Sequence, residues 1–297
     1  MGTIIRTTAI YSEKNPISSV KCSCKAIEHC IASAGIDKVD IDLIINTGIY
    51  REKNIAEPAM ATLIQKESGV NLDPILKFEG NSTFSFDLKN GPVGILYAIQ
   101  VADAMLRTGK IRNALIVSND VHPSTEHIPD FPFTQVGSAM LLEQSDNRNK
   151  GFTKLMFKTS DSTHAGFNSY LDIFQAGHEG RNIVTVKKDK DYINDLLEFT
   201  VRTVGEFIGE YADNGSAVNH IICTLPVKTF GRDLAKRLGI PEERVVSPYE
   251  EYGDPHTSSL AVAYHIVRHK GILSQGEKIL FIGAGAGLTC ACGLYCI

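Results

Sequence analysis

The residues best suited to chemistry are Asp254 and His256, two positions apart in the segment DPHTSS. They precede a helix expected over 258–270, where an imidazole could accept a proton as a general base. A carboxylate so close to it could orient or activate the reacting group. The same pattern also fits a structural role, in which His256 or Thr257 caps the helix beside a turn. Both interpretations stay open.

Two other groups carry ligand-type side chains without the full pattern of a metal site. His265 and His269 stand four apart on one helix, the spacing of a zinc pair, but residue 266 is Ile and no third ligand is evident. The basic run around them is expected to oppose the negative end of the helix dipole. The cysteines are expected to be small core residues. The sequence therefore predicts no metal and no cofactor.

A glycine-rich segment, GAGAGL at 283–288, is superficially similar to a dinucleotide-binding loop. Such a loop must open the helix of a βαβ unit. Only nine residues follow the segment, and they have the pattern of a strand. A dinucleotide site is therefore excluded.

Composition limits the class of protein. The chain has 297 residues with 30 basic and 34 acidic side chains, so its formal net charge is −4. It has no basic excess for nucleic acid, and no apolar run long enough to span a membrane. The 43% hydrophobic content excludes a disordered chain. The first fifteen residues do not form a signal peptide, and the odd number of cysteines, seven, favours reduced thiols in a cytoplasmic protein.

The elements that must position these residues alternate along the chain. Helical periodicity predicts helices at 20–34, 58–68 with Pro58 in its first turn, 92–107, 193–211, 230–238 and 258–270. Short apolar runs predict strands at 41–45, 114–118, 138–142, 220–223, 278–282 and 289–297. The alternation predicts an α/β protein with mainly parallel strands.

The two halves of the chain correspond to each other. VDIDLIINTG at 39–48 matches AVNHIICTL at 217–225, and RTGKIRNALIVS at 107–118 matches SQGEKILFIGA at 274–284. No flexible linker separates the halves, and a polar stretch near 144–160 is the best seam. The sequence predicts a duplication, with halves 1–148 and 149–297 packed as one rigid body around a site between them.

This layout resembles the β-ketoacyl-ACP synthase III branch of the thiolase superfamily. The resemblance is carried by FDL at 86–88, ADAMLRTGKIRNALIVSND at 102–120, AKRLGIPEERVV at 235–246, EYGD at 251–254 and GAGAGLT at 283–289. It implies a thiolase-like fold, with duplicated α-β-α-β-α layered halves and two mixed sheets around a central pair of buried helices. It also implies acyl transfer from CoA to a group on acyl carrier protein, by a dimeric enzyme.

The resemblance implies a Cys-His-Asn triad that this chain lacks. Pro92 falls where the nucleophilic cysteine should begin the buried helix, and no cysteine lies between Cys30 and Cys223. The histidine position maps near Thr224. The asparagine of the motif Tyr-Gly-Asn-Thr-Ser maps to Asp254, which cannot donate a hydrogen bond when ionised. A covalent acyl-enzyme of the usual kind is not expected.

Two further features follow from the resemblance. The loop GAGAGLT would close an oxyanion hole with backbone N–H groups, with Gly285 and Gly287 as candidates. The alternative is a tight glycine turn between two core strands. The family's segment that holds the CoA nucleotide is rich in Arg and Trp, whereas this chain has no tryptophan. The acyl-CoA entrance is therefore expected to be weakened.

The first functional hypothesis is a nucleophile-less partner subunit, a pseudoenzyme that pairs with an active ketosynthase-like paralogue in fatty acid, polyketide or specialised-metabolite biosynthesis. The alternatives are an acyltransferase that uses Asp254 and His256 without a covalent intermediate, and a protein that binds acyl thioesters or another small molecule. Acyl-CoA or acyl-ACP would be the substrate or ligand. Expected partners are a second copy or a paralogue, and acyl carrier protein, with no nucleic acid or membrane.

Overall fold

The first half of the chain forms five strands in a mixed arrangement. The computed structural model describes residues 2–72, 82–123, 131–162, 166–171, 184–211 and 218–297. Strands β1 (Gly2–Tyr11), β5 (Gly137–Ser145), β4 (Ala114–Ser118), β2 (Leu43–Asn46) and β3 (Phe84–Asp87) lie side by side in that order. The β1–β5 and β5–β4 pairs are antiparallel, whereas β4–β2 and β2–β3 are parallel.

The second half repeats this arrangement strand for strand. Its order is β6 (Gly151–Thr159), β12 (Thr289–Cys296), β11 (Lys278–Gly285), β9 (His220–Cys223) and β10 (Val245–Val246). The first two pairs are again antiparallel and the last two parallel. The expectation of mainly parallel strands was therefore wrong. Strand β5 follows β4, and β12 follows β11, with no helix between them among the described residues, and both pairs run antiparallel.

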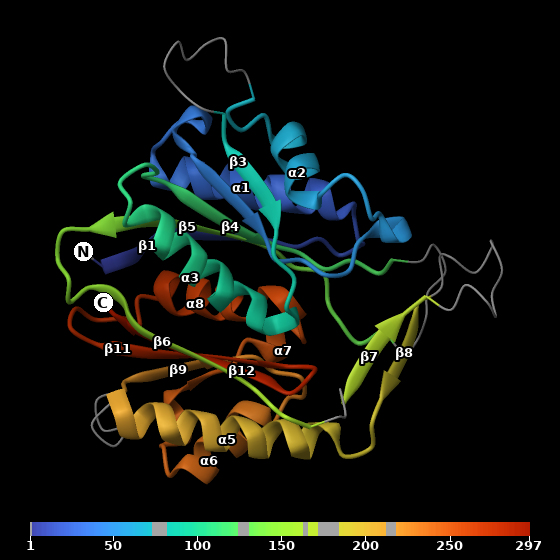
Figure 1. Ribbon diagram of the computed structural model, residues 1–297, viewed down its shortest axis with the longest axis vertical. Coiled ribbons are helices and arrows are strands. Elements are labelled where there is room, and N and C mark those ends of the chain that lie inside the picture. The colour runs from blue at the N-terminus through green and yellow to red at the C-terminus, as the bar shows by residue number, and fades with distance from the viewer. Residues whose placement is uncertain (1, 73–81, 124–130, 163–165, 172–183, 212–217) are drawn as a thin grey trace.

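The two sets of strands meet where β1 lies beside β6. A single residue pair, Thr3 with Phe152, joins them into one continuous ten-stranded sheet. In Figure 1 the sheet nevertheless curves into two layers, with helices above, between and below them. This is the duplicated, layered α/β fold expected from the sequence.

The position of each helix in the fold agrees with the distribution of its apolar and polar residues. Amphipathic α1 (Ser19–Ala34) and α2 (Met60–Ser68) cover the outside of the first set of strands, and α5 (Tyr192–Tyr211) and α6 (Phe230–Leu238) cover the second. Helices α3 (Gly94–Leu106) and α8 (Ser259–His269) lie between the two layers and contact both. Most residues of α3 and α8 are buried, as their apolar surfaces require. The short helix α7 (Tyr249–Tyr252) precedes α8.

Helix α2 begins later than its sequence pattern predicts. The helix starts at Met60, so Pro58 precedes it and does not lie in its first turn. The N–H groups of Met60 and Ala61 instead donate to the carboxylate of Asp87, at 3.0 and 2.8 Å. A carboxylate at this end of a helix satisfies donors that the helix cannot pair internally. Asp87 of the FDL segment therefore anchors α2 to β3.

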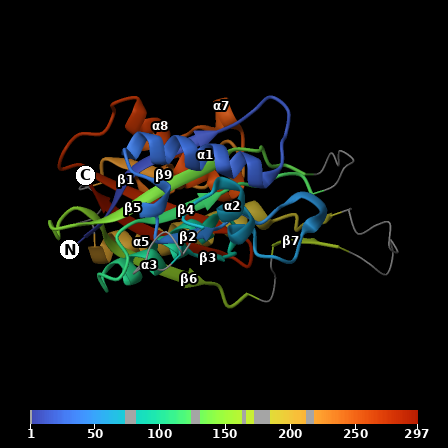
Figure 2. The same cartoon turned by 90° about the horizontal axis from the view of Figure 1, so that it is seen from above.

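A hairpin separate from the main sheet projects from one end of the molecule. It consists of β7 (Phe167–Tyr170) and β8 (Thr185–Lys188), paired antiparallel (Figures 1 and 2). The sequence analysis predicted neither strand. Within the part of the chain that the structure describes, no helix is long and apolar enough to cross a membrane.

Candidate active site

A cavity of about 560 Å³ lies where the two halves meet. Its walls come from the segments that follow β2, β9 and β11, from the start of α3, and from the hairpin β7–β8. Four aromatic side chains, Tyr50, Phe133, Phe167 and Tyr192, give it a largely apolar lining. Such a lining, with a few polar groups among it, suits an organic ligand with an apolar portion.

Four of the residues singled out in the sequence line this cavity together: Pro92, Thr224, Asp254 and His256. They come from three separate segments, so the fold brings together residues up to 164 positions apart. Gly285 and Gly287 are not among the lining residues, although Ala284 and Ala286 are.

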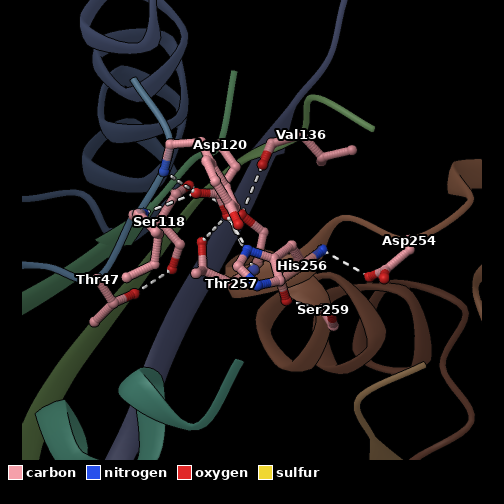
Figure 3. A network of polar contacts seen from close by, with 12 residues as sticks. Thr47, Ser118, Asp120, Val136, Asp254, His256, Thr257 and Ser259 are labelled. Carbon is pink, nitrogen blue, oxygen red and sulfur yellow. Dashed lines mark hydrogen bonds and ion pairs between the residues drawn. The ribbon is translucent and has the colours of Figure 1, made fainter. Parts of the chain in front are cut away.

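The imidazole of His256 is held by Asp120, a residue that the sequence analysis did not select (Figure 3). Nδ1 of His256 lies 2.9 Å from Oδ2 of Asp120. The same oxygen accepts the hydroxyl and the N–H of Thr257, at 2.5 and 3.1 Å. Oδ1 accepts the N–H groups of Ile49 and Tyr50, each at 2.7 Å. Every lone-pair direction of this buried carboxylate is therefore occupied.

These contacts keep Asp120 ionised. Its side chain has no exposed surface, and burial alone would raise its pKa. The adjacent His256, together with the hydrogen bonds from His256, Thr257 and Tyr50, outweighs that effect and holds the pKa below its usual value of 3.8. A carboxylate fixed in this way orients the imidazole and stabilises the positive charge that forms when the ring takes up a proton.

The other ring nitrogen of His256 faces the start of α3. A Cβ built on Gly91 would lie 4.0 Å from Nε2. The ring of Phe133 stacks on the imidazole with 4.0 Å between ring centroids. The backbone of His256 adopts φ 48°, which is unfavourable for a residue with a side chain, and its N–H donates to Oδ1 of Asp254 at 2.8 Å. The surrounding contacts thus hold a strained residue in one orientation.

The carboxyl group of Asp254 has a different environment from that of Asp120. Desolvation raises its pKa from 3.8 to about 6, although His256 acts in the opposite direction. Its side chain contacts the backbone of His256, and the imidazole is bound by Asp120. Asp254 therefore positions the segment and offers a group that exchanges a proton slightly below neutral pH.

The hydroxyl of Thr224 is already engaged with a neighbouring strand. It donates to the carbonyl of Ala284 at 3.1 Å and accepts the N–H of Ala284 at 3.0 Å. Gly285 lies against Pro92, where an added Cβ would come within 3.1 Å of the proline ring. Gly287 has φ 71° in the turn between β11 and β12, the conformation of a tight glycine turn.

Neither of the capping roles considered for His256 and Thr257 is present. No side chain caps α8, and both residues use their side chains to bind Asp120. The helix is anchored by Ser258, whose Oγ lies 3.1 and 2.7 Å from the carbonyl oxygens of Ser118 and Val136 (Figure 3). Asp120 has one signal in the sequence, since it lies two residues after an apolar strand, where functional side chains often gather.

The ligand-type residues outside the cavity have structural contacts. Nδ1 of His265 lies 3.1 Å from both the hydroxyl and the carbonyl oxygen of Thr8, and burial lowers the pKa of His265 to about 4. The seven cysteines are free thiols, six of them buried. Among the described residues, no three His, Cys, Asp or Glu side chains form a group suited to a metal.

The chain matches two family models in sequence. Residues 86–160 match the model of 3-oxoacyl-[acyl-carrier-protein] synthase III, and residues 214–297 match the model of its C-terminal region. Two similar relatives are β-ketoacyl-[acyl-carrier-protein] synthases III. The one from Rickettsia bellii is 26% identical and the one from Clostridium perfringens 24%, each match covering 89% of this chain and 80% of the relative.

Solved structures agree with the fold. The crystal structure of 3-oxoacyl-(acyl carrier protein) synthase III from Pseudomonas aeruginosa superposes with a TM-score of 0.83 at 17% identity, covering 100% of this chain and 98% of that one. OleA from Xanthomonas campestris gives 0.81 at 15% identity, covering 100% and 99%. With the sequence matches, this similarity shows that the chain belongs to the β-ketoacyl-ACP synthase III family of the thiolase superfamily.

Proposed function

We propose that the chain is an acyltransferase of fatty acid or polyketide type that passes an acyl group from a thioester directly to an acceptor, with no acyl-enzyme intermediate. One observation carries this proposal: the buried Asp120–His256 pair, whose second ring nitrogen, Nε2, faces the start of α3 inside the cavity. A subunit with only a structural role would not need a strained histidine held by a fully engaged carboxylate.

In this proposal the nucleophile is a bound acceptor and not a residue of the chain. No cysteine is present in the described lining of the cavity, and the hydroxyl of Thr224 is committed to Ala284. Burial raises the pKa of Tyr50 to about 12, so its hydroxyl stays protonated at neutral pH. A bound acceptor is therefore the group that His256 would activate.

In the proposed step, Nε2 of His256 removes the proton from the acceptor as the acceptor attacks the thioester carbon. The new bond to that carbon forms, the carbon–sulfur bond breaks, and the departing thiolate takes the proton back from the imidazolium. Asp120 stabilises the charged ring between these events.

Turnover of the His256→Gln variant tests the proposal. Release of free thiol from acetyl-, hexanoyl- and benzoyl-CoA, with water as the acyl acceptor, should fall by about 10²–10⁴-fold in this variant, the usual contribution of a general base. The matched control is His29→Gln on the exposed face of α1, which should keep wild-type turnover. Full activity of His256→Gln would contradict the proposal, as would a stable acyl adduct in the intact mass of the wild-type chain.

Pro92 supports a second candidate function, the partner subunit of a cysteine-bearing paralogue. A proline in the short 3₁₀ turn that leads into α3 provides no nucleophile, and Gly283 and Gly285 of β11 pack closely against this turn. Co-expression with an active ketosynthase III should then yield a stable heterodimer whose turnover exceeds that of either chain alone. A homodimer with turnover of its own would exclude this role.

A further inference from the structure

With proline at position 92, the site lacks a backbone N–H donor as well as a nucleophile. Proline has no backbone N–H, so the residue at this position cannot donate a hydrogen bond to a carbonyl group in the cavity. When a thioester is attacked, its carbonyl oxygen gains negative charge and must be met by donors for the reaction to be fast. If the chain transfers acyl groups as proposed, another group near Nε2 of His256 must supply that donor.

Asn90 stands in the right place to do so. It lines the cavity and is half-buried, and a Cβ built on its chain neighbour Gly91 would lie 4.0 Å from Nε2 of His256. The backbone carbonyl of Asn90 accepts the N–H of Val93 at 3.1 Å, which fixes the turn that begins α3. Its carboxamide makes no hydrogen bond to any residue in the described part of the chain.

A second carboxamide in the lining provides a comparison. Asn168 lies on β7 of the hairpin, on a different element from His256 and α3, and it is exposed. Asn90 is the less exposed of the two and stands beside the glycine that faces the catalytic ring. A half-buried amide without a protein hydrogen-bond partner is stabilised when a ligand accepts a hydrogen bond from its N–H group.

We propose that the carboxamide of Asn90 donates the hydrogen bond that holds the thioester carbonyl oxygen while His256 activates the acceptor. This inference rests on the proposed acyl transfer and names the group that stabilises its transition state. The bond from Nδ2 to the oxygen strengthens as the carbonyl becomes tetrahedral, and it weakens again when the carbon–sulfur bond breaks. Asn90 thereby takes over a task that Pro92 cannot perform.

The kinetic test compares Asn90→Ala and Asn90→Asp with Asn149→Ala, a change at an exposed asparagine in the turn between β5 and β6. Loss of one donor to a developing oxyanion lowers kcat by about 10²–10³-fold, so both Asn90 variants should show this loss with little change in KM. The aspartate variant is the sharper of the two, because it keeps the size of the side chain and lacks the donor. Asn149→Ala should behave as wild type, because residue 149 lies outside the cavity lining. An Asn90→Asp enzyme with wild-type kcat would overturn the assignment.

A second measurement does not depend on turnover. The carbonyl stretch of hexanoyl-CoA labelled with ¹³C at the carbonyl is recorded by difference infrared spectroscopy, free and bound to each variant. The bound band should lie at lower frequency than the free band in the wild type, and should return toward the free position in Asn90→Ala. An unchanged band in Asn90→Ala would overturn the role of Asn90 even if His256→Gln abolishes turnover. A band that depends on Asn90 in a chain without turnover would instead refute the acyl transfer and leave the contact standing.

Discussion

Replacing Asp254 with asparagine should stabilise the folded chain at neutral pH and have little effect in acid. Desolvation raises the pKa of this carboxyl from 3.8 to about 6. The folded chain therefore holds a proton at residue 254 more tightly than the unfolded chain does, and the stability contributed by this group is lost as the pH rises from about 4 through 6. Each tenfold change in proton affinity corresponds to about 1.4 kcal/mol, so the ionised group costs the folded chain about 2–3 kcal/mol at pH 8.

The substitution isolates the charge. Asparagine has nearly the same shape, and its carbonyl oxygen can still accept the N–H of His256, which Asp254 accepts at 2.8 Å. The unfolding free energy of Asp254→Asn, minus that of the wild type, should thus be near zero at pH 4 and reach about +2–3 kcal/mol at pH 8.

Urea denaturation at several pH values between 4 and 8 measures this difference. The difference is needed because His265 titrates in the same window. Burial lowers its pKa to about 4, so its contribution to stability rises with pH, but equally in both proteins. Glu250→Gln is the matched control, because this carboxylate is 75% exposed and its surface ion pair with Lys228 contributes little to stability. A constant difference for Asp254→Asn, or a variant less stable than the wild type at pH 8, would refute the reasoning.

Three other substitutions or reactions test separate parts of the structure. Asp120→Asn should lower the unfolding free energy, measured in urea at pH 7, by about 3–5 kcal/mol, because the amide nitrogen would face N–H and O–H groups that now donate to the carboxylate. A loss below about 1 kcal/mol, the contribution of one ordinary hydrogen bond, would contradict this hydrogen-bond network. Pro92→Cys should place a thiol at the start of α3 near His256, and this thiol should be acylated by acyl-CoA. Peptide mapping by mass spectrometry would detect the acyl group on residue 92. An unmodified chain would show that the thiol is not activated there. Iodoacetamide should label the partly exposed Cys296 in the native chain, whereas Cys223 should react only after urea is added, because burial raises the pKa of its thiol to about 12. Labelling of Cys223 in the native chain would contradict its burial.

The sequence was informative wherever a pattern is local. Helix α5 and the strand β9 lie within a residue of the predicted ranges, because a repeat of 3.6 or a short apolar run is visible without knowledge of neighbours. The direction of strand pairing is a property of segments far apart in the chain, and the expectation of mainly parallel strands was wrong for that reason. The strands β7 and β8 were missed because they are short and largely exposed, with no continuous apolar pattern.

In the candidate site, too, the residues recognised from the sequence are those with a local pattern. His256 and Asp254 stood out because two ionisable residues flank a proline before a helix. Asp120 did not, because a single aspartate after a strand is common and its partner lies 136 residues away. The engagement of Thr224 with Ala284 was equally invisible, since it depends on the register of β9 and β11.

The bond between Asp120 and His256 has a mechanical consequence. Asp120 follows β4 in the first half of the chain, whereas His256 introduces α8 in the second, so the bond spans the seam between the halves. A slip of the halves by about 1 Å would stretch this 2.9 Å contact beyond hydrogen-bonding range and release the ring. The orientation of the imidazole therefore depends on how the two halves are aligned. A mutation far from the cavity that shifts this alignment would change the orientation of His256 without contacting it.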